Sequence, residues 1–118
     1  AEGEWSLSEA AEHLLGSQQL IEQRVDLFMS NDAPNLSAKS AREMIDSAGL
    51  PAQALTLAFR KSRSHMLGEL KAAPAATWER IGQHTEFGPV TLQQQVTYFA
   101  KHEHWHMAQM TRIRKALV

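Results

Sequence analysis

Hydrophobic residues recur along the chain at the spacing of amphipathic α-helices. Between Leu7 and Ser30 the apolar positions lie three, four or seven residues apart, so that they share one face of a helix. They are Leu7, Ala10, Leu14, Ile21, Val25 and Phe28. Ser6 and Glu9 have the S-x-x-E spacing of a capping box, which satisfies backbone N–H groups at the start of a helix. The pattern predicts a helix over residues 7–30.

Turn-forming residues divide the rest of the chain into further segments. These are a turn at 31–35, a short helix at 38–47, a long helix at 51–71, one helical turn at 77–81 around Trp78, and a loop at 82–89. Thr91 and Gln94 form a second capping box, and the helix that it opens continues to about Leu117. β-branched residues are too scattered to build alternating strands. We therefore expect an all-α fold, an antiparallel helical bundle.

The length and composition fit a single globular domain. The chain has 118 residues, of which 43% are apolar and 21% charged, so we expect one domain over residues 1–118. No apolar run approaches the roughly 20 residues that span a bilayer, and no segment has the order of a signal peptide. These features predict a soluble, cytoplasmic protein without a membrane partner.

The charge balance argues against a nucleic-acid partner. Lysine and arginine number 12 and acidic residues 13, a net charge of -1 that supplies no strong field for a phosphate backbone. The sole compact basic cluster, RKSRSH at residues 60–65, is typical of a solvated helix face. The absence of cysteine excludes disulfides, thiolate metal sites and a cysteine nucleophile.

Candidate chemistry is concentrated in the stretch KHEHWHMAQM, residues 101–110. On a helical wheel of about 100° per residue, His106 lies within the apolar stripe of the last helix, and His102 lies at its edge one turn away. His104 lies roughly 200° from His102 and points to solvent. The three histidines of this stretch therefore do not all belong to one site.

The inward pair of histidines has two interpretations. An inward histidine is often a core residue that is hydrogen-bonded to a neighbour. Two histidines at i and i+4 also suit a divalent cation, because the ion satisfies one nitrogen of each ring, whereas protonation of either ring repels the other.

A third ligand would strengthen the second interpretation, because open catalytic sites commonly use three protein ligands. His13, at the margin of the first helix's inward stripe, is the best candidate. His65 is expected to be a solvated or stripe-edge residue. His84, in the predicted loop, is the reserve ligand, although loop histidines are usually exposed.

Two blocks of the sequence resemble the DinB-like family of metal-binding four-helix bundles. They are WSLSEAAEHL at residues 5–14 and GPVTLQQQVTYFAKHEHWHMAQMTRIRKAL at residues 88–117, about a third of the chain. The family pattern has a Trp-Ser pair opening a helix that carries one histidine, then a Gly-x-x-Thr-Leu turn into a last helix with H-x-x-x-H-x-x-Q. The matching positions are Trp5, Ser6, His13, Gly88, Thr91, Leu92, His102, His106 and Gln109.

The resemblance implies that His13, His102 and His106 hold a divalent cation such as zinc or nickel. Family members that are understood include metal-dependent transferases and isomerases that use low-molecular-weight thiols, and others are described as candidate hydrolases or stress-induced proteins of unknown role. A divalent ion would lower the pKa of a bound thiol or water and make it a nucleophile. We therefore expect a metal-dependent enzyme that acts on a small electrophile, with a non-catalytic metal-binding or stress-associated oligomeric protein as the alternative.

Other polar residues are weaker candidates for the site. Glu9, a turn before His13, and Glu103 are candidate catalytic proton acceptors, although most helix glutamates are only solvated. Gln109, about a turn beyond His106, is a candidate cofactor-binding residue that orients a ligand, and its other interpretation is a polar residue at the end of the cavity.

One departure from the family pattern concerns the start of the chain. In the family a further long helix usually precedes the Trp-Ser pair, whereas only four residues precede Trp5 here. We expect the first of the four long helices to be absent from this chain, which would leave an apolar groove uncovered. Unless that helix exists and was removed or is disordered, the groove predicts self-association into a homo-oligomer, a dimer.

Overall fold

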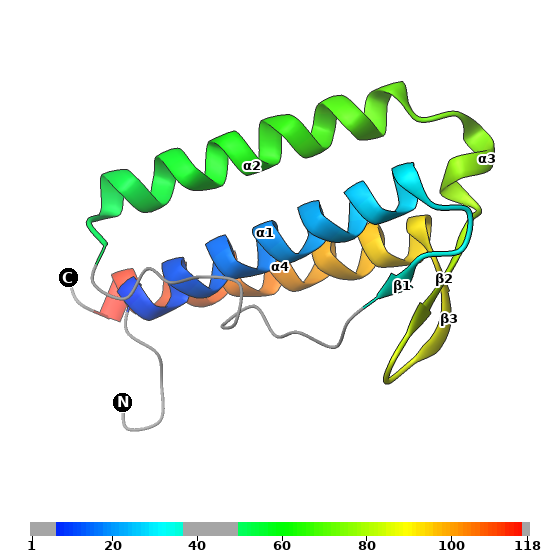
Figure 1. Ribbon diagram of the computed structural model, residues 1–118. Helices are drawn as coiled ribbons and strands as arrows, with labels where there is room; N and C mark the ends of the chain where they lie inside the picture. The colour runs from blue at the N-terminus through cyan, green and yellow to red at the C-terminus, as the bar shows by residue number, and fades with distance from the viewer. Residues whose placement is uncertain (1–6, 37–49, 117–118) are drawn as a thin grey trace.

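The helices lie side by side, and short strands gather at one end of them (Figure 1). The computed structural model describes residues 7–36 and 50–116. The elements are α1 (Leu7–Ser30), β1 (Asn35–Leu36), α2 (Ala52–Ala72), α3 (Ala75–Trp78), β2 (Ile81–His84), β3 (Gly88–Thr91) and α4 (Leu92–Ala116). The all-α fold class is confirmed, because the sheet is a minor addition to a helical bundle.

Helix α1 forms the centre of this arrangement, since it packs against both α2 and α4. In Figure 1, α1 and α2 begin at the same end of the bundle, and α4 begins at the opposite end. Two contacts fix the antiparallel pairing of α1 with α4: His13 lies against His106, and Arg24 bonds to Gln95. The pairing therefore brings the start of α1 to the second half of α4.

The predictions of the long helices are confirmed. Helix α1 has the predicted bounds, and the ends of α2 and α4 lie within one residue of those expected. The Thr91–Gln94 capping box forms, with the Gln94 N–H donating to Thr91 Oγ1 at 3.0 Å and the Thr91 N–H donating to Gln94 Oε1 at 2.9 Å. The helix predicted at 38–47 and the Ser6–Glu9 cap lie outside the described residues. Within those residues no helix combines the length and apolar character that crossing a membrane requires.

A small sheet occupies the stretch predicted to be a loop. Strand β2 pairs antiparallel with β3 and parallel with β1, in the order β1-β2-β3. The prediction of a loop was wrong because it looked for β-branched residues, which strands this short do not require. Their side chains alternate between the two faces instead: Gly82 and His84 of β2 are buried, whereas Ile81 and Gln83 are exposed. Gly88 starts β3 with a φ of +71°, a conformation that glycine adopts without strain.

The segment between α2 and the sheet also differs from the expectation. The helical turn predicted at 77–81 lies at 75–78, as α3, and ends before the chain enters β2. Arg80, between them, donates from Nη1 to the Phe28 carbonyl oxygen at 2.7 Å. This bond satisfies a carbonyl group at the C-terminal end of α1 that has no partner within the helix.

The hydrophobic core lies at the sheet end of the bundle. Its buried residues are Ile21, Val25, Phe28, Leu36, Met66, Leu70 and Leu92. Helix α1 supplies three of them from its predicted apolar stripe, and the remainder come from β1, α2 and the start of α4. The core thus anchors α1, α2 and α4 close to the sheet, and the histidines of α1 and α4 lie farther along the helices.

We expect the substitution Gly82→Ala to destabilise the fold. A Cβ atom at this position would lie 2.9 Å from Phe28 Cζ and 3.2 Å from the Pro34 carbonyl oxygen. Because the Phe28 ring is fully buried, the sheet and α1 would have to separate, and overpacking of this kind costs about 1–3 kcal/mol. Urea unfolding monitored by circular dichroism measures the change.

Gly68→Ala is the matched control for this experiment. Gly68 lies within α2 and is exposed, and a Cβ there meets no atom within 4 Å. Alanine should therefore stabilise the helix by about 0.4–1 kcal/mol. Equal effects of the two substitutions would contradict the close packing of β2 against α1.

Candidate metal centre

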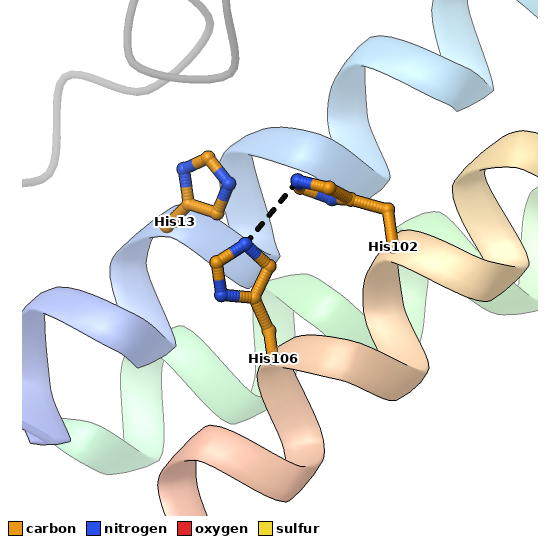
Figure 2. Close-up of side chains that lie close together, drawn as sticks. All are labelled: His13, His102 and His106. Carbon is orange, nitrogen blue, oxygen red and sulfur yellow. Dashed lines mark hydrogen bonds between the residues drawn. The ribbon is translucent and has the colours of Figure 1, made fainter.

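Three imidazole side chains gather between α1 and α4 (Figure 2). His13 comes from α1, and His102 and His106 come from successive turns of α4. The ring centroid of His13 lies 4.4 Å from that of His106 and 5.2 Å from that of His102. One nitrogen from each ring lies within 4.8 Å of the others. The structure therefore brings together the three histidines predicted as ligands, from opposite ends of the chain.

The distance between the two α4 rings matches that of two nitrogens on one metal ion. His102 Nε2 and His106 Nε2 are 3.2 Å apart. Two nitrogens that each lie about 2.0–2.1 Å from a tetrahedral zinc ion are roughly 3.3 Å from each other. The His13 nitrogen lies within 4.8 Å of these atoms, so a small rotation of its side chain would complete a three-nitrogen set.

Gln109 orients the His106 ring. Its Oε1 lies 3.0 Å from His106 Nδ1, and because an amide oxygen only accepts, the proton of the ring sits on Nδ1. His106 Nε2 then presents a lone pair to the centre of the cluster. A hydrogen bond from the outer ring nitrogen is the usual support of a metal-ligating histidine. Gln109 was predicted to orient a ligand, and in the structure it contacts His106, one of the three predicted metal ligands.

His102 is held in its neutral form. Burial, and then the neighbouring His106, lower the pKa of His102. Its Nδ1 is buried and has no hydrogen-bond partner among the described residues. The ring is stacked nearly parallel to Tyr98, with 6.1 Å between centroids. A neutral imidazole is the form that binds metal ions.

The two predicted carboxylates lie outside the imidazole cluster. Both Glu103 carboxylate oxygens accept hydrogen bonds from Arg63 Nη2 at 2.6 Å, and these bonds join α4 to α2. Glu103 therefore points towards α2, about 100° around α4 from His102. Glu9 is exposed in the first turn of α1, one turn before His13. His104 is exposed, as the helical wheel predicts.

His84 does not belong to the imidazole cluster and is not an exposed loop residue. It lies on β2, and only 8% of its surface is exposed. Its Nδ1 accepts hydrogen bonds from the backbone N–H groups of Glu86 and Phe87, at 3.0 and 3.2 Å. The expectation that His84 is a reserve ligand placed it in a loop, whereas the strand directs this ring towards Arg24.

Sequence reasoning missed Arg24. Its side chain is 5% exposed, and Nη1 donates to Gln95 Oε1 at 2.8 Å. A signal was present in the sequence, since Arg24 lies midway between Leu20 and Phe28 at helical spacing, and both of these are buried. A charged residue inside an apolar stripe indicates a buried polar site.

A cavity of about 590 Å³ extends from His13 and His102 to Arg24 and His84. Its volume is within the range of small-molecule sites. Its helical walls consist of one face of α1 and one face of α4. They are formed by His13, Ser17, Leu20, Arg24, Gln94, Gln95, Tyr98, Phe99 and His102, and residues from His84 to Val90 close one end. The cavity can therefore hold a ligand that reaches the imidazoles.

A second cluster of side chains that could hold a metal ion, Asp26, His65 and Glu69, lies on the surface where α1 meets α2. His65 Nε2 lies 2.9 Å from Glu69 Oε1 and 3.5 Å from Asp26 Oδ1. His65 is exposed, as expected. Burial, and then the hydrogen bond with Asp26, raise the pKa of Glu69 to about 7. Clusters of this composition are common on exposed helix surfaces, and no further feature of the described residues marks this one as a metal site.

The sequence was also compared with known protein families, curated proteins and solved structures. The family model described as DinB superfamily matches residues 1–110. No curated protein and no solved structure matches the chain.

The raised pKa of Glu69 predicts a specific dependence of stability on pH. Between about pH 4.5 and 7 the folded chain retains a proton on Glu69 that the unfolded chain releases. The contribution of this carboxyl group to the free energy of unfolding is therefore complete at low pH and is lost as the pH rises through this range. Glu69→Gln keeps the side chain neutral at every pH. The difference in Tm between wild type and Glu69→Gln should therefore shift in favour of the variant from about pH 5 to pH 8.

Glu79→Gln, which removes the same charge at an exposed position, is the control. A Tm difference between wild type and Glu69→Gln that stays constant over this pH range would contradict the retained proton.

Proposed function

Because this chain belongs to the DinB superfamily, we propose that it is a divalent-metal-dependent enzyme in which His13, His102 and His106 hold the metal ion. The convergence of these three imidazoles beside a cavity is the observation that carries the proposal. Three nitrogen ligands leave positions open on a zinc or nickel ion, as catalytic sites require.

A cluster of packing histidines is the competing explanation, and the arrangement of the rings disfavours it. His106 presents Nε2 to His102 Nε2, with its own Nδ1 engaged by Gln109. Protonation of either ring would place a positive charge next to the other imidazoles in a partly buried space. A divalent ion satisfies all three nitrogens at once without such repulsion.

The chemistry proposed is transfer of a low-molecular-weight thiol to a small electrophile, or isomerisation assisted by that thiol. The metal ion, when bound, lowers the pKa of the thiol. Since the sequence has no cysteine, the sulfur has to come from a cosubstrate. Glu9, one turn before His13 in α1, is the proposed proton acceptor.

We also propose that a second copy of the chain covers an apolar groove between α1, α2 and α4. The groove is lined by Leu14, Ile21, Phe59, Met66, Leu67 and Val96, among others. Leu67 is 42% exposed, so the groove opens to the surface. Because the net charge of the chain is -1, electrostatic repulsion between two copies is weak.

Elemental analysis of the untagged chain tests the metal site. We expect one zinc or nickel ion per chain, and His106→Ala should reduce the metal content to well below half, because removal of one of three ligands weakens binding by about tenfold or more. His104→Ala is the matched control, since it removes an exposed imidazole from the same helix. Equal metal loss in the two variants would refute the site.

Catalysis needs a separate measurement on the metal-loaded chain. Thiol cosubstrates and electrophiles such as epoxides, halides and unsaturated acids should give turnover in the wild type and none in His106→Ala. Stoichiometric metal without any turnover would support the alternative of a non-catalytic metal-binding protein.

Light scattering coupled to gel filtration tests the association. We expect the wild type to elute as a dimer, and Leu67→Lys to shift it towards the monomer, because a charge in the groove must be desolvated on association. Leu57→Lys changes an exposed leucine of the same helix outside the groove lining and should remain dimeric. A monomeric wild type would contradict the proposal.

A further inference from the structure

Two aromatic side chains lie at the opening of the cavity beside the imidazole cluster. Phe87, in the turn between β2 and β3, and Tyr98, on α4, both line this cavity. Their exposed fractions are 64% and 54%, so each ring lies where the cavity meets the solvent. Aromatic side chains usually bury most of their surface when a protein folds. Two exposed rings on one cavity therefore indicate a surface that a ligand covers.

Contacts with a buried histidine hold Phe87 in place. The backbone N–H groups of Glu86 and Phe87 donate to His84 Nδ1, at 3.0 and 3.2 Å. The Phe87 ring also lies against the His84 ring, with 4.8 Å between centroids and an angle of 31° between the planes. The turn between the strands, beside the start of α4 in Figure 1, thus supports one side of the Phe87 ring and leaves the rest exposed.

Neighbouring rings on α4 support Tyr98 in the same way. Its ring is nearly parallel to that of His102, with 13° between the planes, and it meets the ring of Phe99 edge to face, with 5.5 Å between centroids. Aromatic pairs prefer such arrangements. The Tyr98 ring is therefore oriented before a ligand binds, roughly 6 Å along the helix axis from His102.

The chemistry of this opening suits an aromatic group. Leu20, Pro89 and Val90 add apolar surface to the walls. A ligand ring that packs on Phe87 and Tyr98 removes their apolar surface from water, and it gains stacked or edge contacts that a saturated ring cannot make. We propose that this cavity binds the aromatic ring of a small molecule, which Phe87 and Tyr98 select.

A second copy of the chain is the competing occupant of this surface, and two observations disfavour it. Neither Phe87 nor Tyr98 lines the apolar groove that we assign to the dimer. Two aromatic side chains supply at most about 500 Å² of contact area, less than the roughly 800 Å² that each partner buries in a stable complex. Glu86 and Gln94, which line the cavity beside them, are polar and exposed.

The position of the aromatic site relates it to the imidazole cluster. His13, Ser17 and His102 line the same cavity, so a substituent on the bound ring can approach the imidazoles. Identification of the aromatic compound as the electrophile rests on the proposed function. Binding of the ring itself does not require the metal ion.

Titrations with 2-phenylethanol and 2-cyclohexylethanol, followed by NMR spectra of the metal-free 118-residue chain, test the site. The two compounds have nearly the same size, and the saturated one is the more hydrophobic, so burial of apolar surface alone favours 2-cyclohexylethanol. We expect 2-phenylethanol to bind at least about threefold more tightly, because its ring makes aromatic contacts with two side chains. The ring resonances of Phe87 and Tyr98 should shift during the titration.

Leucine substitutions at the two positions separate aromatic contact from apolar contact. Phe87→Leu and Tyr98→Leu should each remove the preference for 2-phenylethanol, whereas Tyr98→Phe should retain it because the ring is kept. Trp105→Leu is the matched control, since Trp105 is a 56% exposed aromatic residue of α4 that does not line the cavity, and it should retain the preference.

Four results would overturn the assignment: no saturable binding of either compound, equal or tighter binding of 2-cyclohexylethanol, a preference that survives in both leucine variants, or conversion of a dimer into a monomer by Tyr98→Leu. The last result would assign the two rings to a protein interface. These outcomes are separate from the failure of the proposed function. A chain that prefers 2-phenylethanol but binds no metal would retain the aromatic site and lose the metal centre, and the converse result would do the reverse.

Discussion

The antiparallel pairing of α1 with α4 is the constraint on which the rest of the structure depends. The core of buried apolar residues next to the sheet fixes the register of these two helices. Once that register is set, His13 near the start of α1 has to lie beside His102 and His106 of α4. The imidazole cluster is therefore a product of packing some distance away, and no local sequence feature could assemble it alone.

The same pairing leaves a polar cavity along the interface of α1 and α4. Burying imidazoles and a guanidinium costs free energy unless partners satisfy them, so these side chains have to be fixed by hydrogen bonds. Gln109 does this for His106, Gln95 does it for Arg24, and backbone groups do it for His84. These three side chains are consequently held in place before any ligand arrives, which reduces the entropic cost of binding.

The sequence predicts the helical part of this structure well because its signals are local. Periodic apolar residues and the Thr91–Gln94 cap define α1, α2 and α4 within one residue, and the helical wheel separates His104 from His102 and His106. The sheet was missed because its strands are too short to show a periodic pattern of β-branched residues. The pairing of Glu103 with Arg63 was missed because these residues meet only after the helices pack. Arg24 was missed for the same reason, since Gln95 and His84, which it contacts, lie on α4 and β2.

X-ray absorption spectroscopy of the zinc-loaded chain tests the central claim most directly, because it reports the atoms that surround the ion. The structure predicts three imidazole nitrogens at about 2.0–2.1 Å, with the remaining positions occupied by oxygen or by an added thiol sulfur. A coordination shell made up mainly of oxygen, or one with a single imidazole, would contradict the assembly of one metal centre from His13, His102 and His106.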